Sequence, residues 1–480
     1  ASEAPLRPAP SCGSRAVAAM VSRRAAAAVS STAAFLLLLG AASAGLSGYF
    51  GTKSRYEEVN PHLMEDPLSL GPSAGSSRLP AACAPLQLRA VVRHGTRYPT
   101  AGQIRRLGEL HARLLRRPTA APATAAACPA AANLSAWQMW YEESLDGRLA
   151  PQGQRDMEHL ARRLAARFPA LFAPRRRLAL ASSSKHRCLQ SAAAFRRGLG
   201  PSLSLGDEEE VEVNDSLMRF FDRCAKFVAL VEENDAAMCQ VNAFKEGPEM
   251  AKVLEKVASA LCLPVEELNA DLVQVAFLTC SYELAVKNVT SPWCSLFTEE
   301  DAKVLEYLND LKQYWKRGYG YDINSRSSCI LFQDIFQHLN KAVEESKSSK
   351  PISSPLIVQV GHAETLQPLL ALMGFFKDDE PLRANNYVRQ TDRKFRSGRI
   401  VPYAANLVFV LYHCDQVKTS EEEYQVQMLL NEKLMSFHHL NETISTYADL
   451  KDYYKDILEN CHFKEECELP KINITAVDEL

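Results

Sequence analysis

The sequence predicts an α/β fold with a sheet core flanked by helices and an inserted, mainly α-helical cap. Two observations predict the layers and the insertion. Strand-like apolar segments alternate with helical patterns in the first part of the chain, which is typical of α/β layers, and further strand-like segments follow residue 350. Residues 206–350 between them contain helical patterns and no convincing strand. With 480 residues, 47% of them hydrophobic, the chain is long enough for a sizeable core and more than one subdomain.

Short apolar runs identify the strands, and apolar residues recurring every three or four positions identify the helices. The expected strands are 86–92, 177–182, 355–360 and 405–412. The expected helices include 104–115 and 153–168 between the first two strands, and 250–261 and 301–315 in the insertion.

These patterns divide the chain into five parts. The expected parts are an upstream extension with a signal peptide at 1–44, the first part of the α/β core at 45–205, the helical cap at 206–350, the second part of the core at 351–470, and a tail at 471–480.

The first 44 residues have the three parts of a secretory signal peptide. Arg23 and Arg24 precede an apolar block that ends in the small residues Ala42-Ser43-Ala44, and we expect cleavage after Ala44. A retained membrane anchor is the alternative, but the strongly apolar centre at 35–39 is too short to span a bilayer alone. We therefore expect no stable membrane anchor after cleavage, and we expect the residues before Met20 to be dispensable.

Other features agree with entry into the secretory pathway. Twelve cysteines lie beyond the signal segment, and Cys461 and Cys467 are close enough in sequence for a local disulfide. The C-terminal Val477-Asp478-Glu479-Leu480 resembles a KDEL-type signal, so we expect a retention receptor as partner and residence in the endoplasmic reticulum lumen, with partial secretion as the alternative. The N-glycosylation pattern occurs at Asn133, Asn214, Asn288, Asn441 and Asn473.

Three of the predicted strands end in polar residues that can do chemistry. Residues 93–97 (RHGTR) follow the first strand, 182–187 (SSSKHR) follow the second, and 361–364 (GHAE) follow the third. In open α/β sheets ligands bind beyond the carboxyl ends of the strands. If these strands are parallel neighbours, their tips form one site.

The residue types at these tips suit phosphoryl transfer. Arginines such as Arg93 and Arg97 donate paired, charge-assisted hydrogen bonds to phosphate oxygens. A histidine among cations, as His94 is, stays neutral and can attack phosphorus in line. Glu364, two residues after His362, can protonate the departing alkoxide and then deprotonate water. From spacing alone, Arg187 could equally face solvent.

Competing motifs have the wrong context. Cys83 to Arg89 matches Cys-x5-Arg, but its interior begins with proline and continues as strand, so we reject it as a phosphatase loop. Residues 71–75 match G-x-S-x-G without a strand before or a helix after. Because neither a Walker A sequence nor a convincing zinc-ligand spacing is evident, we expect a reaction without metal or other cofactor.

Charge is distributed unevenly along the chain. The formal net charge is -2, yet residues 89–197 contain 20 Lys and Arg against 6 Asp and Glu. A nucleic-acid surface is one interpretation, but an endoplasmic reticulum address argues against nucleic acid as a partner. A substrate with several phosphates fits this basic segment better.

The motifs also carry a family resemblance. Residues 93–99 (RHGTRYP) match the RHGxRxP signature of the histidine acid phosphatases. His362-Ala363-Glu364 resembles the second motif of the branch that acts on multiple inositol polyphosphates, whereas other branches usually have His-Asp there. Residues 325–339 and 395–414 also resemble that branch, and the likeness extends over essentially all of 45–480.

The resemblance implies a histidine-phosphatase-like α/β core with a helical cap. It also implies which residues carry the reaction and which substrates the protein accepts. His94 is the nucleophile and Glu364 the proton donor, while Arg93, Arg97, Arg187 and His362 bind the transferring phosphoryl group. The implied substrates are inositol hexakisphosphate, inositol pentakisphosphate and the 3-phosphate of 2,3-bisphosphoglycerate. Because the HAE triplet departs from the usual HD, the donor's position is the least fixed of these roles. The alternatives are a broad-specificity histidine acid phosphatase and a catalytically silent polyanion-binding protein.

Overall fold

The computed structural model describes residues 45–71, 82–116, 128–174, 176–200, 211–415 and 417–469. The signal segment at 1–44, Asn473 and the C-terminal tetrapeptide at 477–480 lie outside the described residues, so their roles stay predictions. Within the described part, no helix is both long and apolar enough to cross a membrane.

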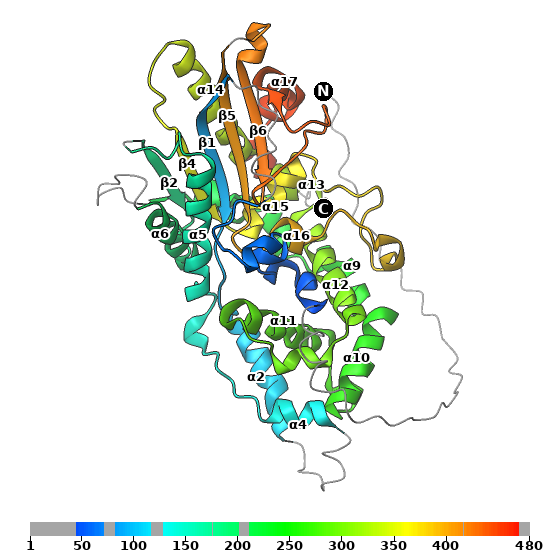
Figure 1. Cartoon of the computed structure of the whole chain (residues 1–480). Coiled ribbons are helices and arrows are strands. Elements are labelled where there is room, and N and C mark those ends of the chain that lie inside the picture. The colour runs from blue at the N-terminus through cyan, green and yellow to red at the C-terminus, as the bar shows by residue number, and fades with distance from the viewer. Residues whose placement is uncertain are drawn as a thin grey trace, which may run out of the picture.

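An eight-stranded mixed sheet forms the centre of the molecule, in the order β3-β2-β4-β1-β5-β6-β7, with β8 paired to β6 (Figure 1). The four predicted strands are confirmed as β1 (Cys83–Arg93), β2 (Leu178–Ser182), β4 (Leu356–Gly361) and β5 (Asn406–Cys414). Four further strands were not predicted from the sequence: β6 (Tyr424–Leu430) and the two-residue strands β3 (Glu212–Val213), β7 (Lys433–Leu434) and β8 (Ser445–Thr446). Strands β2, β4 and β1 run parallel, whereas β5 is antiparallel to β1.

Helices cover both faces of the sheet, as the α/β prediction requires. Helices α5 (Pro151–Arg167) and α6 (His186–Leu199) pack on the face that carries Leu88, Ala90 and Val92. Helices α14 (Cys329–Lys347) and α15 (Ala363–Leu372) pack on the opposite face with Val91. The alternation of apolar residues in β1 thus supplies two separate cores.

A helical part lies beyond the sheet, in the lower half of Figure 1. It contains α10 (Pro248–Leu261), α11 (Ala270–Lys287) and α12 (Glu299–Arg317), which agree with the helical patterns of the insertion. Helices α2 (Ala101–Leu115) and α4 (Pro129–Ser135), from before residue 205, pack against α11 and α10. The domain boundaries at 205 and 350 stay a prediction, and the structure adds α2 and α4 to the helical part.

The described chain contains five disulfides, and all but Cys280–Cys294 join segments that are distant in the sequence. They are Cys83–Cys414, Cys128–Cys262, Cys224–Cys467, Cys280–Cys294 and Cys329–Cys461. Cys461 and Cys467, which are close enough in sequence for a local disulfide, do not pair with each other, and their partners are Cys329 and Cys224. Cys467 is the last residue of helix α19 (Phe463–Cys467), whereas Cys461 precedes this helix.

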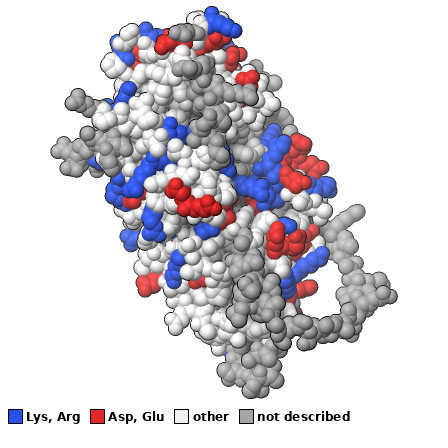
Figure 2. Space-filling view, viewed as in Figure 1, with Lys and Arg blue, Asp and Glu red and all other residues white. Residues whose placement is uncertain are grey.

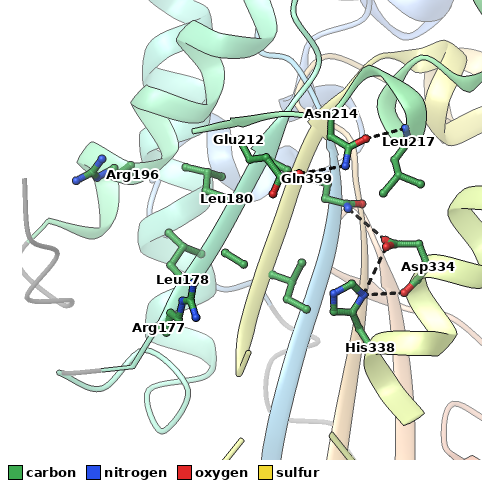
Figure 3. Close-up of a pocket in the computed structure, with 13 residues that line it drawn as sticks. Arg177, Leu178, Leu180, Arg196, Glu212, Asn214, Leu217, Asp334, His338 and Gln359 are labelled. Atoms are coloured by element: carbon green, nitrogen blue, oxygen red, sulfur yellow. Dashed lines mark hydrogen bonds and ion pairs between the residues drawn. The ribbon is translucent and has the colours of Figure 1, made fainter. Parts of the chain in front are cut away.

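The Cys-x5-Arg motif has a structural role, which agrees with its rejection as a phosphatase loop. Cys83 is bonded to Cys414 at the start of β1, far along the strand from Arg93. Arg89 is fully buried, pairs with Asp334, and donates from Nη2 to Gln359 Oε1 at 2.9 Å. Asp334 and Gln359 line a cavity of about 410 Å³ between the sheet and α14 (Figure 3).

Candidate active site

The three polar strand tips meet at one edge of the sheet, as predicted. Arg93 pairs with Gly361 across β1 and β4, and Ser182 pairs with Val360 across β2 and β4. Beyond the strands, His94 N donates to Gly361 O and Ser183 N donates to Val360 O, both at 3.0 Å. Because the three strands are adjacent and parallel, the residues that follow them lie together.

His94 is buried and oriented by its own backbone. Its Nδ1 atom lies 2.8 Å from the carbonyl oxygen of Gly95. A carbonyl can only accept, so Nδ1 carries the proton and Nε2 keeps its lone pair. Burial, followed by the fields of Arg93 and Arg187, lowers the pKa of His94 well below its usual value. The ring is therefore neutral, and the lone pair of Nε2 is available.

Gly95 allows a close approach between two backbones. A Cβ at Gly95 would lie 2.2 Å from the carbonyl oxygen of Gly153 in α5, and a Cβ at Gly153 would lie 2.1 Å from that of Thr96. Asp156, also in α5, accepts from the Thr96 backbone N–H at 2.9 Å. The glycine after His94 is therefore needed for contact with α5.

Arg93 is held rigidly beside His94. Its Nη1 atom donates to the carbonyl oxygens of Thr52 at 2.7 Å and Val401 at 2.6 Å. Its guanidinium also lies over the ring of Tyr403, with Cζ 4.7 Å from the ring centroid. Burial lowers the pKa of Arg93 to about 10, so the side chain remains a cation at physiological pH.

His362 has hydrogen-bonding partners at both ring nitrogens, and Cys188 Sγ also lies 3.8 Å from Nδ1 and 3.6 Å from Nε2. Arg187 Nη2 lies 3.3 Å from Nδ1, and Ser183 Oγ lies 2.8 Å from Nε2. Because arginine can only donate, Nδ1 is the acceptor, and the proton of Nε2 points to Ser183. Burial, and then Arg187, lowers the pKa of His362 to about 3. Its ring lies 5.7 Å from that of His94, centroid to centroid.

Glu364 lies in the first turn of α15 and lines the same cavity as His94. Burial alone would raise its pKa, but Arg317, a backbone hydrogen bond and Arg93 outweigh burial and hold the pKa well below its usual value. Glu364 is thus a carboxylate in this structure. A proton-donor role requires that it gain a proton when a polyanion binds and offsets the cations around it.

A cavity of about 440 Å³ surrounds these groups and is strongly cationic. Its lining includes two carboxylates, Glu232 and Glu364. The cations of the lining are Lys53, Arg93, Arg97, Arg106, Arg187, Lys312, Lys316 and Arg317. Figure 2 shows Lys and Arg side chains gathered across the middle of the molecule, between the sheet and the lower helices.

Five of these cations were not predicted from the sequence. Lys53 lies before β1, Arg106 lies in α2, and Lys312, Lys316 and Arg317 lie in the last turns of α12. The basic end of α12 gives a weak sequence signal, but basic residues are common at helix C-termini. Three of the four predicted phosphate-binding residues line the cavity, namely Arg93, Arg97 and Arg187. Both predicted catalytic residues, His94 and Glu364, line it as well. His362 contacts Arg187 beside it.

A family model described as histidine phosphatase superfamily (branch 2) matches residues 86–431. The chain belongs to this family. It is 85% identical over 92% of its length to multiple inositol polyphosphate phosphatase 1 of Gallus gallus, covering 96% of that protein. The corresponding Homo sapiens protein is 56% identical over 91% of this chain and 92% of its own length. The protein is therefore a histidine acid phosphatase, as the motifs predicted.

A solved structure has the same fold. It is the Bifidobacterium longum multiple inositol polyphosphate phosphatase in complex with inositol hexasulfate, with a TM-score of 0.62 and 15% identity over 84% of this chain and 96% of that one. The likeness confirms the mixed α/β core with its many helices.

The remaining predicted sites fall at the surface or outside the described residues. Asn133, Asn288 and Asn441 are exposed, whereas Asn214 is half-buried beside the cavity of Figure 3 and donates to Glu212 Oε1 at 3.2 Å. Glycosylation at these positions stays a prediction. Within the described residues, no group of three or more His, Cys, Asp or Glu could hold a metal ion.

Proposed function

We propose that this histidine acid phosphatase is a metal-independent phosphomonoesterase acting on inositol hexakisphosphate, inositol pentakisphosphate and the 3-phosphate of 2,3-bisphosphoglycerate. The names of the relatives in chicken and human support the inositol polyphosphates. The observation that carries the proposal is the cavity around His94, with eight cationic side chains and two carboxylates in its lining. A site with this charge suits a substrate with several phosphates.

The reaction proceeds through a phosphohistidine. Nε2 of His94 attacks phosphorus while the bond from phosphorus to the ester oxygen breaks. Glu364, protonated in the complex, gives its proton to the leaving alkoxide. Glu364 then takes a proton from water, whose oxygen attacks the phosphohistidine and breaks the N–P bond. Arg93, Arg97 and Arg187 hold the transferring group through both steps. His362 joins them when a phosphate oxygen replaces Ser183 Oγ as the acceptor of its Nε2 proton.

The protein acts in the lumen of the endoplasmic reticulum. The signal-peptide pattern and the VDEL ending of the sequence support this location, with a retention receptor as partner. The five disulfides agree with an oxidising compartment.

Phosphate release from inositol hexakisphosphate, measured with excess chelator present, tests the proposal. We expect release by the wild type and none by His94→Ala. Binding without release by the folded wild type would support the silent polyanion-binding alternative. If the wild type releases no phosphate from inositol hexakisphosphate, a second assay with 2,3-bisphosphoglycerate shows whether the protein prefers a different phosphomonoester or is inactive.

A further inference from the structure

Glu232 is the carboxylate of the cavity lining that the proposed mechanism does not use. It lies at the end of the π-helix η8 (Val228–Glu232), an irregular element that occurs frequently at functional sites. Its Oε1 atom accepts from Lys316 Nζ at 2.8 Å, and its Oε2 atom accepts from Arg317 Nη2 at 2.7 Å. Each oxygen thus accepts a hydrogen bond from one cationic side chain at the end of α12.

Arg317, one of the two donors, is held in place by its neighbours. The guanidinium of Arg317 lies over the rings of Phe221 and Phe227, with Cζ 5.5 and 5.0 Å from their centroids. Arg317 Nη1 also donates to the carbonyl oxygen of Lys316 at 3.2 Å. The Arg317 side chain is 10% exposed and that of Lys316 is 18% exposed, so both are partly desolvated.

A carboxylate with one oxygen on a lysine and the other on an arginine is bound as a phosphate would be. Charge-assisted donors of this kind bind phosphate and carboxylate oxygens alike. A phosphate group carries more negative charge than the carboxylate of Glu232 and has three acceptor oxygens. The donors of Lys316 and Arg317 can therefore exchange one anion for another.

We propose that Glu232 is a specificity-determining residue, a built-in competitor that holds Lys316 and Arg317 until a second phosphate of the substrate displaces it. This inference rests on the proposed function, because it needs a substrate with more than one phosphate in the cavity. The phosphate attacked by His94 and the phosphate bound at the end of α12 belong to one molecule. A monophosphate fills the first position and leaves Glu232 in place.

Glu232 should therefore affect the affinity for polyphosphates more than the affinity for monophosphates. Each polyphosphate must displace Glu232 to use these two donors, so the competition lowers the affinity for substrates that reach them. Glu232→Gln keeps the size of the side chain and removes its charge. Glu233→Gln is the matched control, because Glu233 is the exposed next residue and lies outside the cavity lining.

We would measure kcat and KM of both variants on inositol hexakisphosphate and on an aryl monophosphate, with inhibition by inositol hexasulfate. We expect Glu232→Gln to bind inositol hexakisphosphate and inositol hexasulfate about tenfold more tightly, the scale of one hydrogen bond to a charged group. Its KM for the aryl monophosphate should change much less, and Glu233→Gln should match the wild type. Glu232→Asp keeps the charge, so its affinity for inositol hexakisphosphate should be close to that of the wild type and lower than that of Glu232→Gln.

Two results would overturn the inference. One is equal behaviour of Glu232→Gln and Glu233→Gln on the polyphosphate. The other is a higher KM of folded Glu232→Gln for both substrates, which would make Glu232 a support for the two cations. Failure of the proposed function is a different result, because the wild type itself would then release no phosphate from inositol hexakisphosphate.

Discussion

The hydroxyl oxygen of Ser183 lies 2.8 Å from Nε2 of His362, and this contact connects the tip of β2 to the tip of β4. Arg187 approaches the other ring nitrogen, and Cys188 Sγ lies near both, so all three partners of the ring come from the segment that follows β2. The imidazole is thereby held in one tautomer and one orientation. This arrangement makes Ser183 a positioning residue for His362.

Removal of the Ser183 hydroxyl should therefore lower activity without unfolding the protein. We expect Ser183→Ala to reduce kcat on inositol hexakisphosphate about 10-fold, because small misplacements of site groups slow the chemical step. Ser184→Ala is the control, because the Ser184 side chain is exposed. A wild-type kcat in Ser183→Ala would show that the hydroxyl does not position His362.

Arg93 should not tolerate lysine. The guanidinium reaches two backbone carbonyls and the ring of Tyr403 while it faces the cavity, and an ammonium has no planar fork to do this. We expect Arg93→Lys to lower kcat/KM about 100-fold and to lower the melting temperature. Arg105→Lys, at a side chain that is 63% exposed, should change neither quantity.

The acid role of Glu364 should depend on the leaving group. We expect Glu364→Gln to slow hydrolysis of alkyl phosphates about 10²- to 10⁴-fold, and to slow an aryl phosphate far less, because a phenolate leaves without a proton. Steady-state kinetics on both substrate classes measures the difference. Equal losses on the two classes would remove Glu364 from the acid role.

Binding of a polyanion should be accompanied by proton uptake. Arg317 and Arg93 hold the pKa of Glu364 low, and a bound polyanion neutralises their fields. Calorimetric titration with inositol hexasulfate, in two buffers of different ionisation enthalpy, measures the protons taken up. We expect the uptake near pH 5 to be smaller in Glu364→Gln. No difference between the two proteins would contradict this assignment of the proton.

Stability should decrease at acidic pH because of the buried histidines. Burial and nearby arginines keep the pKa of His362 at about 3 in the folded state, whereas an unfolded histidine takes up its proton near about pH 6.5. Between these values the unfolded state binds one more proton per such ring, so the free energy of unfolding falls by up to about 1.4 kcal/mol per pH unit.

Urea unfolding at pH 4.5 and 5.5 tests this expectation. His362→Asn should show a smaller pH dependence than the wild type, by about 1.4 kcal/mol per pH unit. His186→Asn, at an exposed histidine, is the control. A wild-type pH dependence in His362→Asn would mean that His362 is already protonated in the folded state.

The sequence by itself determined the chemistry of the strand tips. An apolar strand ending in Arg93-His94-Gly95-Thr96-Arg97 is a local pattern, and a parallel sheet brings such ends to one edge. For this reason the four main strands, the convergence of the tips and the neutral state of His94 could be predicted.

Only the tertiary structure decided what surrounds these tips. The outer cations, the partners of Cys461 and Cys467, the ionised state of Glu364 and the contact of Glu232 with Lys316 and Arg317 all depend on packing between distant segments. The pKa of a side chain depends on its burial and on the charges around it, and an ion pair depends on which side chains meet. Sequence neighbours alone determine neither of these.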